Sequence, residues 1–85
     1  MKNKDYTIRI NNPFHARPVS IFISAAEKYT SEITVKHDSS EYNGKSILNM
    51  MSINPYPGDI ISICVDGIDE GIAFKELDEI LNQII

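Results

Sequence analysis

The chain has 85 residues, which is enough for one hydrophobic core and too few for two. A hydrophobic content of 42% and a charged content of 24% are typical of a folded globular protein and exclude a disordered chain. The net charge is −4 and the basic residues are scattered, which argues against a nucleic-acid-binding protein. We therefore expect one domain that spans residues 1–85.

Cysteine usage and hydropathy predict the compartment. The single cysteine, Cys64, excludes an internal disulfide framework and is typical of a reducing cytoplasm. The polar opening MKNKD leads directly into a strand pattern, so no secretion signal is expected. No apolar run approaches the length of a membrane span. These features predict a cytoplasmic protein without membrane insertion.

The first predicted element is a strand, because Tyr6, Ile8 and Ile10 alternate with polar residues. From Ala16 the apolar residues recur at helical spacing and predict an amphipathic helix. Pro18 fits its first turn, where a proline sacrifices no intrahelical hydrogen bond. The apolar stripe of this helix consists of Val19, Phe22, Ile23, Ala26 and Tyr29.

The middle of the chain predicts a hairpin and a short helix. Ile33 and Val35 alternate with polar residues in a second strand, residues 38–40 form a turn, and residues 41–44 form a short third strand. Ser46 precedes the segment ILNMMSI and is placed to cap a short helix.

The last third predicts a loop at residues 54–58, a strand at residues 59–65 and a final helix that begins near Asp69 and Glu70. The buried stripe of that helix consists of Ala73, Phe74, Leu77, Ile80, Leu81 and Ile84. The order is therefore βαββαβα, an α+β fold with one sheet covered by helices on one face. The other face is open to solvent and is expected to carry Thr7, Arg9, Thr34 and Lys36.

Two residues between the first strand and the first helix could carry chemistry. His15 lies where free backbone N–H groups and the helix dipole attract anions, and the Arg17 guanidinium matches phosphate oxygens. An imidazole nitrogen is also a nucleophile near neutral pH, so the pair could accept and stabilise a phosphoryl group. A helix-capping histidine beside a solvated arginine fits the same residues, and the sequence pattern leaves both interpretations open.

Two other features allow more than one interpretation. Ser46 could be only a helix cap, or a phosphate on its hydroxyl could occupy the same helix start. A two-turn helix cannot bury Ile47, Leu48, Met50 and Met51 together, and Ile21 lies off its own helix's apolar stripe. Some of these residues should face solvent as a docking surface, although ordinary core filling also explains them.

Other motifs predict little chemistry. His37 is expected to end a strand rather than to bind a metal, because no other ligand lies at suitable spacing. Cys64 is expected to be structural, and no phosphate-binding glycine loop or paired catalytic carboxylates are present. We therefore expect no metal and no cofactor.

Three segments resemble one family, the HPr phosphocarrier proteins of the bacterial phosphotransferase system. FHARPVSIF resembles the family's active-site segment, KSILNMMSI its second signature, and DGIDE the start of its last helix. The resemblance spans nearly the whole chain without a gap. It implies the family's open-faced β-sandwich, with a four-stranded antiparallel sheet and three helices packed on one face.

The resemblance also implies a role for the first site. His15 would accept a phosphoryl group on Nδ1 from enzyme I, which phosphoenolpyruvate charges, and pass it to enzyme IIA domains of sugar permeases. Arg17 and the backbone N–H groups of Ala16 and Arg17 would stabilise the phosphohistidine. The protein would be a covalently modified carrier rather than an enzyme. We also expect a monomer, although exposed strand edges would permit pairing or swapping.

For Ser46, the resemblance implies phosphorylation by HPr kinase/phosphorylase, as in carbon catabolite repression. The implied partner-binding surface comprises Ser20, Ile21, Ser24, Ile47, Leu48 and Met51. An alternative is an HPr-like regulatory module whose phosphorylated form docks a catabolite-control transcription factor. Such paralogues often lack the active histidine, so the presence of His15 and Arg17 favours the carrier.

The chain departs from the family pattern at several positions on the implied partner-facing surface. Pro13 stands where a small residue, often glycine, is usual, and Asn49 stands where glycine is frequent. Glu27 replaces a frequent lysine, and residues 54–57 replace a more glycine-rich loop. Because proline fixes φ and removes a donor, Pro13 is expected to stiffen the loop before His15.

Overall fold

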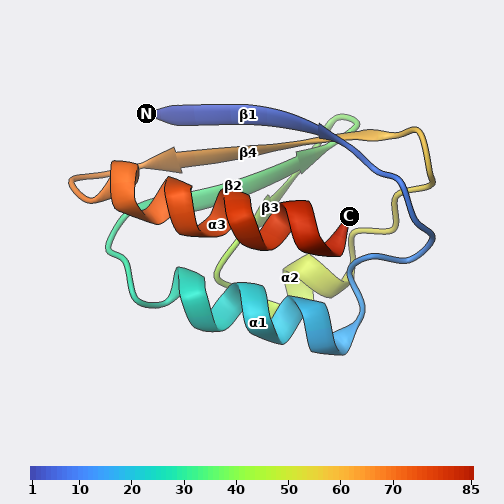
Figure 1. Cartoon of the computed structure of the whole chain (residues 1–85), viewed down its shortest axis with the longest axis horizontal. Helices are drawn as coiled ribbons and strands as arrows, with labels where there is room; N and C mark the ends of the chain where they lie inside the picture. Colours follow the sequence, from blue (N-terminus) through green and yellow to red (C-terminus); the bar gives the residue numbers. More distant parts are fainter.

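The computed structural model describes all of residues 1–85 and contains four strands and three helices (Figure 1). In chain order they are β1 Lys2–Thr7, α1 Ala16–Ala26, β2 Glu32–His37, β3 Ser40–Asn43, α2 Ile47–Met51, β4 Ile60–Asp66 and α3 Glu70–Ile84. The predicted βαββαβα order is confirmed. None of the helices has the length and hydrophobicity needed to cross a membrane.

The four strands form one antiparallel sheet in the order β1-β4-β2-β3, so β4 is a central strand paired on both sides. The three helices lie on one side of this sheet, and α2 packs against α1 (Figure 1). The predicted open-faced architecture is therefore confirmed. The uncovered face carries Thr7, Thr34 and Lys36, whose partners on β4 alternate with its buried residues.

The core lies between the sheet and the helices, where the apolar face of the strands packs against the apolar stripes of the helices. Ile61, Ile63 and Val65 of β4 are fully buried, and so are Val19 and Phe22 of α1. On α3 the buried stripe is narrower than predicted and contains Ala73, Leu77 and Leu81. The other three apolar residues of the predicted stripe are partly buried against the same core: Phe74, Ile80 and Ile84.

The first strand is displaced from its predicted position. It ends at Thr7; Ile8 is buried beyond it, and Ile10 is 49% exposed. Ile8 exchanges backbone hydrogen bonds with the turn before β4, and the chain then leaves the sheet. The placement of Arg9 on the open sheet face is therefore wrong. Its backbone N–H donates to the Ile85 carbonyl and its guanidinium to the Asn82 carbonyl, so Arg9 binds the last turn of α3.

Two smaller boundaries also differ from the prediction. Helix α1 ends at Ala26, so Tyr29 lies beyond the helix, partly buried, and its hydroxyl donates to Glu76 of α3. The β2–β3 turn is tighter than expected and uses only residues 38 and 39, with Asp38 at φ 56°. An aspartate tolerates this left-handed conformation better than most residues, which permits the tight hairpin.

Candidate functional site

The start of α1 is held by apolar contacts on both sides of three exposed residues. Phe14 precedes the N-cap and Val19 lies in the first turn; both are buried in the core cluster, in the arrangement called a hydrophobic staple. Pro13 is also buried, and Asn12 before it adopts φ 49°. The loop is therefore anchored just before residue 15, while residues 15–17 remain exposed.

His15 is the N-cap residue of α1, with an extended backbone at φ −91° and ψ 178°. Its carbonyl accepts the Val19 N–H at 3.1 Å, which is the first hydrogen bond of the helix. Its side chain is exposed and makes no capping hydrogen bond. His15 therefore caps α1 through its backbone only, and its imidazole is left available for other chemistry.

The surroundings of His15 can stabilise an anion. The N–H groups of Ala16 and Arg17 lie in the first turn, where a helix provides no acceptor for them. The Arg17 side chain is exposed and pairs with no carboxylate. The first turn of α1 also contains no acidic residue that would repel an anion. A nucleophilic imidazole, a free guanidinium and free N–H groups thus share one helix start.

Ser46 occupies the corresponding position on α2, and its predicted capping role is confirmed. Its Oγ accepts the backbone N–H of Asn49 at 3.2 Å. The Asn49 carboxamide Nδ2 also donates to this Oγ at 3.2 Å. The half-buried Ser46 hydroxyl is therefore engaged twice, in contrast to the imidazole of His15.

The prediction that some apolar residues face solvent is also confirmed. Met50 of α2 is fully buried, but Leu48 is 82% exposed and Ile21 of α1 is 52% exposed. All six residues of the implied docking surface are exposed, and they lie on two helices that pack together: Ser20, Ile21, Ser24, Ile47, Leu48 and Met51. The three on α1 also line an open groove between α1 and α3, together with Lys28 and Glu76.

The sequence shows that Asn49 departs from the family pattern, but it does not show what the Asn49 side chain does. Its carboxamide Oδ1 accepts the backbone N–H of Asn43, so it joins the end of β3 to the start of α2. The sequence does contain a signal, because Ser46 and Asn49 have the spacing of a capping box, in which the third helical residue reaches back. Asparagine replaces the usual Glu or Gln of that motif.

Several titratable groups have clearly shifted pKa values. Hydrogen bonds from Ser31 and from the Thr30 N–H lower the pKa of Asp69 to about 2. The Tyr56 N–H, and next His37, lower the pKa of Asp59. His37 ends β2 as expected and its Nε2 lies 3.0 Å from Asp59 Oδ2. No group of three His, Cys, Asp or Glu residues is placed to hold a metal ion.

Comparison with known proteins agrees with this geometry. A family model described as "PTS HPr component phosphorylation site" matches residues 2–83. The phosphocarrier protein HPr of Borreliella burgdorferi is 37% identical over 83 residues, which cover 98% of this chain and 96% of that protein. The HPr-like protein Crh of Halalkalibacterium halodurans is 32% identical over 77 residues, which cover 91% and 92%.

Solved structures give the same result. The histidine-containing phosphocarrier protein of Mycoplasma superposes with a TM-score of 0.87 at 30% identity, covering 94% of this chain and 91% of that one. A dimer of HPr from Thermoanaerobacter tengcongensis matches with a TM-score of 0.73 at 32% identity, covering 98% and 95%.

The fold and the matches define a protein of the phosphocarrier class, which carries a phosphoryl group and is not an enzyme. The chain belongs to the HPr family of the phosphotransferase system. Because both HPr and Crh proteins are similar to it, family membership alone leaves its role in transport or regulation open.

Proposed function

We propose that this protein carries phosphoryl groups on His15 from enzyme I to enzyme IIA domains of sugar permeases. The observation that supports it is the exposed His15 imidazole, which caps no helix and lies beside Arg17 and two free N–H groups. In the first transfer, Nδ1 of the neutral imidazole forms a bond to phosphorus while the bond between phosphorus and enzyme I breaks. In the second transfer, the bond between Nδ1 and phosphorus breaks while the acceptor group of the IIA domain forms a bond to phosphorus.

The neighbours of His15 stabilise the transferred group in this proposal. The Arg17 guanidinium supplies donors in a fork that fits phosphate oxygens, and its charge offsets part of the phosphoryl charge. The N–H groups of Ala16 and Arg17 donate to the same oxygens, as backbone donors at a helix start commonly do for phosphate. The absence of acidic residues from this turn favours the phosphorylated form.

Labelling with enzyme I and radioactive phosphoenolpyruvate tests the carrier function. The wild-type protein is expected to gain an acid-labile, base-stable label, which is the behaviour of phosphohistidine. His15→Ala is expected to gain none, whereas His37→Ala, the control at the other histidine, is expected to be labelled normally. An unlabelled wild type, or equal labelling of His15→Ala, would overturn the proposal.

We further propose that Ser46 is a regulatory site for HPr kinase/phosphorylase. The half-buried hydroxyl begins α2, the helix that also exposes Ile47, Leu48 and Met51. A phosphate there would add negative charge beside the docking residues, disfavouring acidic partners and favouring basic ones. Incubation with ATP and the kinase should give an acid-stable label that is missing from Ser46→Ala; equal labelling of that variant would contradict the assignment.

The surface formed by Ser20, Ile21, Ser24, Ile47, Leu48 and Met51 is proposed to dock these partners. Exposed apolar side chains beside the first turns of α1 and α2 would bring a partner's phosphorylated group within reach of His15. All proposed partners act in the cytoplasm, and we place the protein there. Substitution of Leu48, which is 82% exposed, by a charged residue should slow transfer without changing the fold.

The alternative is a regulatory module like Crh, whose phosphorylated form docks a catabolite-control transcription factor. Similarity to a Crh protein is the observation that favours it. The two functions differ in what depends on His15, since a module that acts only through Ser46 needs no phosphohistidine. Normal sugar uptake in cells that carry His15→Ala would favour the regulatory module, and lost uptake would favour the carrier.

We propose that the protein acts as a monomer. The edge strand β1 pairs along its whole length with β4 of the same chain. The Lys4 ammonium and the Tyr6 hydroxyl also bind Asp78 of α3 at 2.8 and 2.7 Å. Sedimentation equilibrium tests this proposal. A concentration-independent dimer mass would contradict it and would resemble the solved HPr dimer.

A further inference from the structure

Asn49 makes two hydrogen bonds to the proposed regulatory hydroxyl of Ser46. Two of its groups donate to Ser46 Oγ at 3.2 Å, the backbone N–H and the carboxamide Nδ2–H. A hydroxyl oxygen has two lone pairs, so these two donors occupy both of its acceptor sites. The hydroxyl proton stays free to be donated, but neither lone pair is free to attack.

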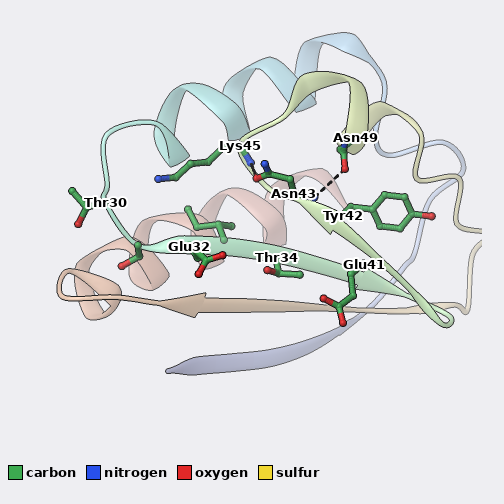
Figure 2. A pocket seen from close by; sticks show the side chains of 10 residues that line it. Thr30, Glu32, Thr34, Glu41, Tyr42, Asn43, Lys45 and Asn49 are labelled. Atoms are coloured by element: carbon green, nitrogen blue, oxygen red, sulfur yellow. Dashed lines mark hydrogen bonds between the residues drawn. The ribbon is translucent and has the colours of Figure 1, made fainter.

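The carboxamide of Asn49 is itself held in place. Its Oδ1 accepts the Asn43 backbone N–H at 3.2 Å, and Figure 2 shows Asn49 directed toward Asn43 at the end of β3. The Asn43 carbonyl accepts the Ser46 N–H at 3.1 Å, and its Oδ1 accepts the Lys45 N–H at 2.9 Å. The orientation of Nδ2 toward Ser46 is therefore fixed from the opposite side.

We propose that Asn49 is a positioning residue that restrains the Ser46 hydroxyl and slows its phosphorylation. This inference rests on the proposed regulation at Ser46. In that reaction Oγ forms a bond to the γ-phosphorus of ATP, the bond to ADP breaks, and the hydroxyl proton passes to a base of the kinase. One lone pair must be released first, and the backbone N–H is the less dispensable donor because it caps α2.

Asn49→Ala tests the inference by steady-state kinetics with the kinase and ATP. It deletes both carboxamide hydrogen bonds and retains the backbone bond to Ser46. The loss of one hydrogen bond to the nucleophile should raise kcat about fivefold, which corresponds to about 1 kcal/mol, and leave KM unchanged. Asn3→Ala is the matched control, because Asn3 is exposed on β1, away from α2, and its side chain makes no hydrogen bond.

A double-mutant cycle of Ser46→Ala and Asn49→Ala provides a readout without the kinase. The coupling should change the unfolding equilibrium constant by about twofold to fivefold, because each single variant removes one partner of the same contact. A coupling of zero would overturn the inference whatever the kinase does. This measurement separates the contact itself from any contribution of Asn49 to kinase binding.

The kinetic outcomes distinguish this inference from the proposal on which it rests. If Ser46 of the wild type is labelled and Asn49→Ala has an equal or lower kcat, the restraint is refuted while regulation at Ser46 stands. If neither protein is labelled, both are refuted. Faster labelling of Asn49→Ala, with Asn3→Ala unchanged, supports the inference.

Discussion

The starts of α1 and α2 are built on similar backbones but treat their first side chain in opposite ways. His15 and Ser46 are both N-cap residues with extended backbones, at φ −91° and φ −110°. The His15 side chain accepts and donates no hydrogen bond within the chain, whereas Ser46 Oγ accepts two from Asn49. One helix start therefore leaves its side chain free, and the other engages it fully.

The difference arises from how each helix is secured. Helix α1 has 11 residues, and the buried Phe14 and Val19 form a hydrophobic staple at its start, so it does not depend on a side-chain cap. Helix α2 has only five residues, and a helix that short needs its cap because few internal hydrogen bonds stabilise it. Buried apolar contacts thus allow the N-cap side chain of α1 to stay free and reactive. A side-chain cap, as in α2, would restrain it.

The largest expected effect concerns the charge at the free helix start. Arg17→Ala should slow phosphoryl transfer from phospho-enzyme I tenfold or more, because a charge-assisted hydrogen bond is worth about 1.5 to 3 kcal/mol. Rapid-quench measurement of labelling checks this prediction. The control is Arg9→Ala, whose guanidinium binds the Asn82 carbonyl at the end of α3. Equal slowing of both variants would refute a specific role for Arg17.

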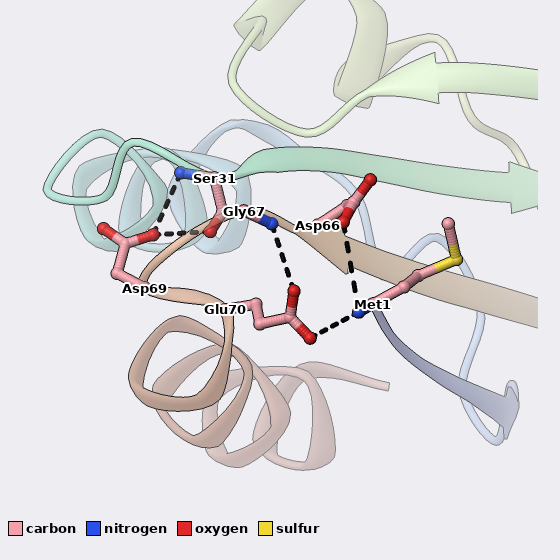
Figure 3. A network of polar contacts seen from close by, with 6 residues as sticks. All are labelled: Met1, Ser31, Asp66, Gly67, Asp69 and Glu70. Atoms are coloured by element: carbon pink, nitrogen blue, oxygen red, sulfur yellow. Dashed lines mark hydrogen bonds and ion pairs between the residues drawn. The ribbon is translucent and has the colours of Figure 1, made fainter.

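The start of α3 extends the comparison, because there the N-cap side chain bonds to a different segment. Asp69 accepts the Thr30 N–H at 2.8 Å. It also accepts the Ser31 N–H at 3.0 Å and the Ser31 hydroxyl, as Figure 3 shows. It therefore joins α3 to the loop that precedes β2 and makes no side-chain hydrogen bond that caps its own helix. Gly67 permits the close approach, since a Cβ there would lie 2.5 Å from Ser31 Oγ.

This contact predicts a loss of stability in acid. The pKa of Asp69 is lowered to about 2 in the folded chain, so the unfolded chain binds the proton more readily. The stabilisation is complete above the ordinary pKa of an aspartate, near 4, and is lost as the pH falls toward 2. Between pH 5 and pH 2, the melting temperature of Asp69→Asn should fall less than that of Glu27→Gln. Glu27 serves as the control because it is exposed and forms no ion pair. An equal fall in the two melting temperatures would refute the prediction.

Alanine substitution at the two helix starts should separate stability from function. Ser46→Ala removes a cap and should lower the free energy of unfolding by about 1 kcal/mol. His15→Ala removes an exposed side chain without a partner and should change that free energy by less than about 0.5 kcal/mol. Urea unfolding measures both. A loss at His15 as large as at Ser46 would show that the imidazole supports α1 after all.

The fold could be predicted because each element shows a clear periodicity. Alternation in DIISICV and helical spacing after Ala16 place the apolar residues on one side of each element, and a single sheet covered by helices on one face buries them. The path after β1 could not be predicted in the same way. Ile10 continues the alternation but is exposed, because hydrogen bonds from Arg9 to the distant end of α3 redirect the chain.

The candidate site, too, could be predicted from the sequence only in part. The position of His15 and Arg17 at a helix start followed from local sequence, and so did the cap at Ser46. The contact of Asn49 with Ser46 depends on side-chain orientation and on the position of β3, which spacing does not determine. Likewise, the bond between Asp69 and Ser31 joins residues 38 positions apart, so only the folded chain shows it.

The smallest expected effect is at Pro13, the residue that departs from the family next to His15. Pro13→Gly should lower the free energy of unfolding by about 0.5 to 1 kcal/mol, because glycine increases the freedom of the unfolded chain. Transfer from phospho-enzyme I should change by less than about twofold, since the buried Phe14 and Val19 still anchor the start of α1. Urea unfolding and rapid-quench labelling measure the two quantities on one variant. If transfer instead falls tenfold while stability holds, Pro13 orients His15, and apolar anchoring alone does not explain why that side chain is free.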